Sequence, residues 1–88
     1  MKGMDYKSEV VALTKKFIEF NTINPPGNEM EIARYAGGLL KEYGFQVSYI
    51  PYQEGRIHVV ADMKGTQYLD PVIFTGHFDT VPLGQQAW

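Results

Sequence analysis

Residues 72–79 read Val-Ile-Phe-Thr-Gly-His-Phe-Asp, an apolar run that leads into a glycine and then into two polar side chains. A short apolar run bounded by Pro71 and Gly76 is typical of a buried strand. Buried strands of open α/β sheets present functional side chains at their carboxyl ends. Alternation along an extended segment places His77 and Asp79 on one side of the chain. The sequence therefore predicts a buried strand at residues 72–74, with this pair at its end.

The His-x-Asp pair has two interpretations. An imidazole with a neighbouring carboxylate suits metal binding, because the carboxylate fixes the tautomer and orientation of the ring. The alternative is a histidine at a strand end that is simply satisfied by a nearby acid, with no function. The residues alone leave both interpretations open.

The composition limits the remaining possibilities. Eighty-eight residues can form one small domain, and the formal charge of -2 gives no reason to expect nucleic acid or an anionic membrane as a partner. There is no cysteine, which excludes disulfides, thiolate ligands and thiol nucleophiles. No apolar run approaches the roughly 20 residues of a membrane span, and no signal-peptide pattern is seen at the start. We expect a cytoplasmic protein.

Two helices are predicted before the first strand. An apolar stripe at three- and four-residue steps favours a helix over residues 5–20, with Asp5 as the amino-terminal cap and the stripe in the core. Pro25-Pro26-Gly27 breaks the chain into a loop at residues 21–28. Asn28 and Glu31 have capping-box spacing at the start of a second helix, which Gly44 should end. Gly37 and Gly38 in mid-helix predict close approach to the sheet.

The rest of the chain favours strands. Residues 45–50 alternate apolar and polar side chains, residues 51–56 have turn composition, and residues 57–63 are again rich in apolar side chains. The predicted fold class is α/β, with two amino-terminal helices packed on a three-stranded part of a larger mixed sheet.

Two motifs carry a resemblance to a known family. Gly-His-Phe-Asp-Thr-Val-Pro at residues 76–82 follows Asn-Pro-Pro-Gly-Asn-Glu at residues 24–29. In this order they resemble the co-catalytic zinc amidohydrolases and exopeptidases, which include acetylornithine deacetylase, succinyl-diaminopimelate desuccinylase, aminoacylase and carboxypeptidase G. The resemblance implies two zinc ions, with cobalt as a possible substitute, and His77 as a ligand of one of them. It implies that Asp79 is the catalytic partner of His77.

In that family, metal-bound hydroxide cleaves the amide bond of N-acyl amino acids or small peptides. The resemblance also suggests that the loop at residues 21–28 lies near the active-site rim; a rigid interhelical connection is the alternative. Two features depart from the family. His58 stands where the family usually has asparagine, and we interpret it as a surface or satisfied histidine. Asp-Met-Lys-Gly at residues 62–65 looks like a later family motif but precedes His77, so we interpret it as coincidence.

The predicted site is incomplete, because no acid or histidine follows Asp79 in the sequence. We therefore expect residues 1–88 to be the amino-terminal part of a catalytic domain, inactive by itself, and a truncation or proteolytic remnant. The alternative is a non-catalytic α/β module that associates with itself into a homo-oligomer, because a strand without a sheet neighbour exposes an edge.

Overall fold

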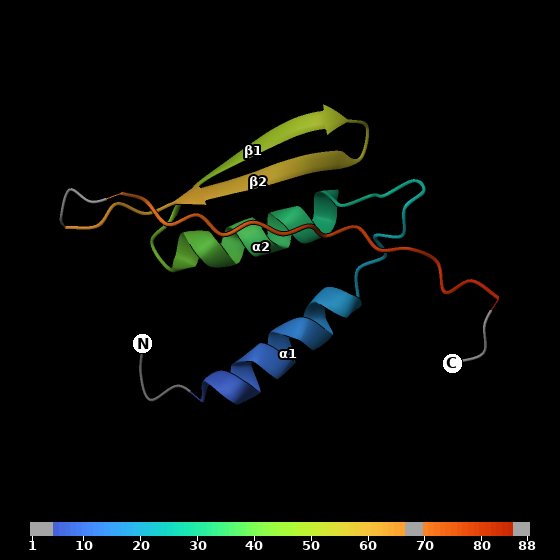
Figure 1. Ribbon diagram of the computed structural model, residues 1–88, viewed down its shortest axis with the longest axis horizontal. Helices are drawn as coiled ribbons and strands as arrows, with labels where there is room; N and C mark the ends of the chain where they lie inside the picture. The colour runs from blue at the N-terminus through green and yellow to red at the C-terminus, as the bar shows by residue number, and fades with distance from the viewer. Residues whose placement is uncertain (1–4, 67–69, 86–88) are drawn as a thin grey trace.

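Two helices precede a two-stranded antiparallel sheet in the computed structural model, which describes residues 5–66 and 70–85. The helices are α1 (Tyr6–Ile18) and α2 (Met30–Glu42), and the strands are β1 (Gln46–Gln53) and β2 (Arg56–Asp62). Figure 1 shows α2 lying between the β hairpin and α1, with the last part of the chain running along α2. The α/β class is confirmed.

Helix α1 begins as predicted but packs less than expected. The Asp5 side chain accepts hydrogen bonds from the Ser8 backbone N–H at 3.4 Å and from its hydroxyl at 2.8 Å. However, no residue of α1 is buried, and Tyr6 and Val10 are 63% and 62% exposed. The predicted core role of the stripe is wrong at these positions, because α1 lies beyond α2 and does not face the hairpin (Figure 1).

The core lies between α2 and the hairpin. The buried apolar side chains of the described residues are Ile32, Ala33 and Ala36 on α2 and Ile57 on β2. Gly37 is buried, and a Cβ atom there would collide with the hydroxyl of Tyr49 on β1. This confirms the close approach of helix and sheet at Gly37, whereas Gly38 has no neighbour within 4 Å of such an atom.

The sequence predicted the carboxyl-terminal end of α2 but not its amino-terminal end. Gly44 adopts a positive φ of 95° directly after the helix, as expected for a left-handed terminator. The predicted capping box of Asn28 and Glu31 is wrong, because the N-cap residue is Glu29 and makes no side-chain cap hydrogen bond. The N–H of Met30 instead donates to the carbonyl of Gly55 in the hairpin turn, at 3.2 Å.

The sheet is smaller than predicted. β1 continues through Pro51 to Gln53, so the turn predicted at residues 51–56 is confined to the two residues before β2, and the register is irregular near Pro51. The predicted third strand at residues 72–74 is wrong. Val72, Ile73 and Phe74 are 80%, 82% and 93% exposed and belong to no strand. A strand needs a hydrogen-bonding neighbour, and the described residues provide none beside this run.

The segment that follows is nevertheless held in place. Ile23 and Thr80 form a parallel bridge, in which the Thr80 N–H donates to the Thr22 carbonyl at 3.0 Å. The Asn24 N–H donates to the Thr80 carbonyl at 2.7 Å. This bridge brings the loop after α1 against residues 77–80. Neither helix of the described residues has the length and apolar content to cross a membrane.

Candidate functional site

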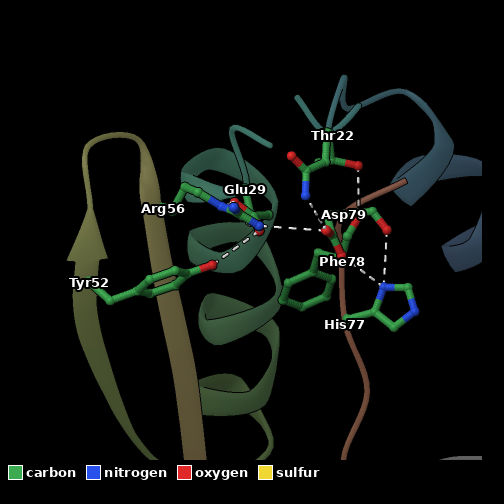
Figure 2. A network of polar contacts seen from close by, with 8 residues as sticks. Thr22, Glu29, Tyr52, Arg56, His77, Phe78 and Asp79 are labelled. Atoms are coloured by element: carbon green, nitrogen blue, oxygen red, sulfur yellow. Dashed lines mark hydrogen bonds and ion pairs between the residues drawn. The ribbon is translucent and has the colours of Figure 1, made fainter. Parts of the chain in front are cut away.

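The predicted pair of His77 and Asp79 is brought together beside the bridge (Figure 2). The Nδ1 atom of His77 lies 3.0 Å from the Oδ1 atom of Asp79 and 3.0 Å from its backbone carbonyl oxygen. Phe78 points to the other side, where its ring meets Phe17 edge-on at a centroid distance of 6.0 Å. The expected alternation is therefore present without a strand.

The two side chains of the pair differ in exposure. That of His77 is 82% exposed and that of Asp79 is 28% exposed. Since Nδ1 faces the carboxylate, Nε2 lies on the far side of the ring, toward solvent. An imidazole fixed in this way can offer an Nε2 lone pair to a metal ion or to a proton.

The second oxygen of Asp79 has its own partners. The Asn24 side-chain amide donates to Oδ2 at 3.0 Å, and the Nη2 atom of Arg56 lies 3.5 Å from the same oxygen. The hydrogen bond from Asn24 is the main reason that the pKa of Asp79 lies below its ordinary value. The contacts with His77 and Arg56 act in the same direction, against partial burial. Asp79 is therefore an anion at neutral pH.

Arg56 is held by a buried carboxylate at the start of α2. Its Nε atom donates to both oxygens of Glu29, at 3.1 and 2.9 Å, and its Nη2 atom donates to Oε1 at 2.7 Å. The Glu29 and Arg56 side chains are only 8% and 17% exposed. These hydrogen bonds lower the pKa of Glu29, and the Tyr52 hydroxyl also donates to this carboxylate at 3.4 Å. Such fork-shaped pairing fixes the plane of the guanidinium.

Thr22 and Gly27 determine how the loop at residues 21–28 packs against these polar side chains. The buried Thr22 hydroxyl donates to the Phe78 carbonyl at 2.7 Å, which anchors the backbone next to His77. Gly27 has a φ of +72°, and a Cβ atom built there would lie 2.9 Å from the Cζ atom of Arg56. The loop thus needs a glycine both for its backbone conformation and for the space that the guanidinium occupies.

His77 stands between two clefts. One, of about 610 Å³, separates β2 from residues 74–79 and includes Tyr52 and Arg56 in its wall. The other, of about 620 Å³, is mostly apolar and is lined on the α1 side by Phe17, Phe20 and Ile23. A small molecule in either cleft could reach the imidazole.

Sequence reasoning found His77 and Asp79 but missed the residues around them. Asn24 and Glu29 lie in the quoted Asn-Pro-Pro-Gly-Asn-Glu motif without having been assigned a role. Arg56 carried no signal except that it is a cation in a hairpin turn. The loop at residues 21–28 touches the pair directly through Asn24, which is more than a connection needs.

The other two residues weighed as candidates make no contact with His77 or Asp79 that the structure records, although His58 lines the cleft beside β2. His58 is exposed and stacks on Tyr52, with a centroid distance of 4.2 Å and an interplanar angle of 16°. Asp62 is exposed at the end of β2. Within residues 5–66 and 70–85, no three His, Cys, Asp or Glu side chains are grouped to hold a metal ion. The described residues thus supply one free imidazole nitrogen for a metal, not a complete site.

Comparison with known proteins gives one informative match. The chain is 33% identical over 91 residues to an N-formyl-4-amino-5-aminomethyl-2-methylpyrimidine deformylase of Bacillus subtilis (strain 168). That relative is a hydrolase. As a deformylase it acts on an amide bond. The match covers 99% of this chain but 21% of the relative, so the chain spans about a fifth of the length of the curated relative it matches. No family model and no solved structure matches.

These findings overturn the predicted membership of the zinc amidohydrolase and exopeptidase family. No model of a family matches the chain, and the enzyme that does match is a formylaminopyrimidine deformylase, not one of the four enzymes named for the resemblance. The predicted family and this relative share only the general reaction class, because both hydrolyse amide bonds.

Proposed function

We propose that this chain carries part of the active site of a hydrolase that removes a small acyl group, such as formyl, from an amine. The observation that carries the proposal is the exposed His77 imidazole, whose Nδ1 atom is held by Asp79 while its Nε2 atom faces solvent between two clefts. The similarity to a deformylase supports the reaction class. N-acyl amino acids and small peptides are the wider substrate class to test.

Each residue has a distinct part in this proposal. Asp79 is the catalytic partner: it accepts the Nδ1–H of His77 and so keeps the proton off Nε2. Because the pKa of Asp79 is lowered, chiefly by Asn24, the carboxylate remains charged and able to accept this hydrogen bond. His77 then has an Nε2 lone pair directed at whatever occupies the clefts.

A divalent metal ion, zinc or cobalt, fits the donor that His77 offers. A bound zinc ion supplies a water of lowered pKa and polarises a carbonyl oxygen. Neutral imidazole is a common ligand of zinc, and the Asp79 contact is the arrangement that orients such a ligand. A catalytic zinc needs about three protein ligands, so further ligands must come from outside the described residues.

The test measures formate release from a formylaminopyrimidine by the protein expressed from the complete reading frame that encodes these residues. We expect His77→Ala to lower the rate by more than the roughly 10–100-fold that is typical of losing only an outer partner of a metal ligand. The control is Val10→Ala, at a residue of α1 that is 62% exposed and lines neither cleft, and it should leave the rate within about twofold, because surface substitutions have small effects. Equal rates for the two variants would refute the proposal. The 88-residue chain alone should bind zinc weakly and show no turnover.

A second candidate, a self-associating module, is favoured by the exposure of Val72, Ile73 and Phe74. Large exposed apolar runs mark interaction sites. Sedimentation of the 88-residue chain separates this candidate from the first: a stable dimer that Phe74→Ser dissociates would support it, and a monomer at all concentrations would exclude it.

A further inference from the structure

We propose that Asn24 and Arg56 are positioning residues that hold one oxygen of Asp79, so that its other oxygen faces His77. This inference rests on the proposed function of His77, yet the arrangement itself can be observed without substrate or metal. It assigns roles to two residues for which the deformylase similarity provides none.

The division of the Asp79 carboxylate is the first step of the argument. Oδ2 accepts a hydrogen bond from Asn24 Nδ2 at 3.0 Å and lies 3.5 Å from Arg56 Nη2, whereas Oδ1 lies 3.0 Å from His77 Nδ1. A carboxylate is planar, so fixing Oδ2 also fixes the direction in which Oδ1 points. Both oxygens are thus used, each by a different part of the site.

The backbone cannot set this orientation by itself. Residues 71–79 belong to no strand, and the hydrogen bonds from Thr22 and Thr80 hold the main chain around Phe78 and Thr80 only. Rotation of the Asp79 side chain is left to its side-chain partners. Asn24 and Arg56 come from two separate elements, the loop after α1 and the start of β2, and meet at Oδ2. Figure 2 shows the contact between Arg56 and Asp79.

Asn24 and Arg56 contribute differently. Arg56 is already paired with Glu29 through three contacts of 2.7–3.1 Å, so its charge is largely neutralised, and its 3.5 Å contact with Asp79 is the weaker one. The guanidinium also lies 5.5 Å from the centre of the Tyr52 ring, which helps to fix its place. Asn24 makes the closer contact with Asp79, so its loss should disturb His77 more than Arg56→Lys does.

The chemical consequence is a choice of tautomer. When Oδ1 accepts from Nδ1–H, neutral His77 carries its proton on Nδ1 and leaves Nε2 unprotonated. A free histidine side chain in water favours the Nε2–H form. Asp79 offers two acceptors to Nδ1–H, since both Oδ1 and the backbone carbonyl oxygen lie 3.0 Å from Nδ1. The positioning residues act on Oδ1 and so add to the preference that the backbone carbonyl already gives, which is the form that a ligand or base at Nε2 requires.

The experiment reads this tautomer directly. Long-range proton–nitrogen correlation spectra of the labelled 88-residue chain, all recorded at the same alkaline pH, distinguish Nδ1–H from Nε2–H at each histidine. We expect mainly Nδ1–H at His77, and a shift of the ratio toward Nε2–H by about fivefold in Asn24→Ala, the effect of one hydrogen bond. Arg56→Lys should shift the ratio less. The exposed His58 serves as the internal control for Asn24→Ala, where it should not change; it does not serve for Arg56→Lys, because His58 stacks on the Tyr52 ring that Arg56 also contacts.

Two results would overturn the inference: His77 already in the Nε2–H form in the unsubstituted chain, or an Asn24→Ala ratio equal to that of the unsubstituted chain. If Arg56→Lys does not fold, which the amide spectrum reports, Asn24→Ala decides alone, since Asn24 is part of no helix and no buried ion pair. If the tautomer ratios are as expected but the complete protein releases no formate, the proposed function is refuted and the positioning is not. Histidine-dependent turnover with an unshifted ratio would refute the positioning only.

Discussion

Replacing Glu29 by glutamine tests whether the buried ion pair stabilises the fold. Glutamine has nearly the same shape, but it removes the charge that Arg56 faces and turns one acceptor oxygen into a donor. The Glu29 side chain is only 8% exposed and accepts from two nitrogen atoms of Arg56 and from the Tyr52 hydroxyl. The variant would therefore leave a mostly buried guanidinium with a poor partner.

The magnitude follows from burial and from the partners that remain. Removing one member of a buried ion pair costs about 3–5 kcal/mol. Arg56 keeps Asp79 at 3.5 Å and is 17% exposed, so water and a second anion offset part of the loss. We expect a loss of about 2–3 kcal/mol in the free energy of unfolding. A domain with so small a core should have a stability near the low end of the usual range, about 5 kcal/mol.

Urea denaturation followed by circular dichroism measures this loss. With a slope of about 1 kcal/mol per molar urea, the midpoint should fall by about 2–3 M. The matched control is Glu19→Gln, which makes the same chemical change in an exposed pair with Lys16, where the glutamate side chain is 66% exposed. Its effect should stay below about 0.5 kcal/mol. Equal losses in the two variants would show that burial of the Glu29 pair contributes nothing.

Three further predictions concern pH, helix packing and capping. The folded state lowers the pKa of Glu29 and of Asp79, so the stability that these carboxylates contribute is complete above their unfolded-state pKa and is lost as the pH falls through the lowered folded-state pKa. The urea midpoint measured at decreasing pH should show this loss, and Glu29→Gln should make the midpoint depend less on pH. Gly37→Ala should cost about 1–3 kcal/mol because its methyl group meets a tyrosine of β1, whereas Gly38→Ala has open space and should gain up to about 1 kcal/mol of helix propensity; the opposite order of midpoints would contradict the packing. Asp5→Ala should cost about 1 kcal/mol through the lost cap of α1, measured as helical circular dichroism on heating, and no change would mean that this helix end is frayed.

Features set by neighbouring residues could be predicted from the sequence. The cap at Asp5 and the terminator at Gly44 each depend on one residue and its immediate surroundings, and each is present. The close approach at Gly37 was predicted from the cost of a glycine inside a helix, although the partner, Tyr49, lies on β1. The alternation that places His77 and Asp79 on one side is likewise a property of an extended chain, whether or not a strand forms.

Features that depend on partners far away in the sequence could not be predicted. The apolar run at residues 72–74 predicts burial, but a local pattern does not say whether the partner that covers it lies among the described residues. The capping box failed because the start of α2 contacts the hairpin: Met30 bonds to Gly55 in the turn, and Glu29 pairs with Arg56 of β2, 27 residues away. Asn24 meets Asp79 across 55 residues, which no local pattern predicts. The two motifs indicated amide hydrolysis but were too short to identify one family of hydrolases.

Gly27 makes two positions of the chain dependent on each other. Any side chain at residue 27 would have to occupy the space of the Arg56 guanidinium, in a backbone conformation that other residues rarely adopt. An arginine held at 56 by Glu29 therefore disfavours any side chain at 27, whereas a shorter residue at 56 removes the steric part of that restriction. Among natural variants of this protein, we expect replacements at 27 to be found only together with the loss of the arginine, never alone.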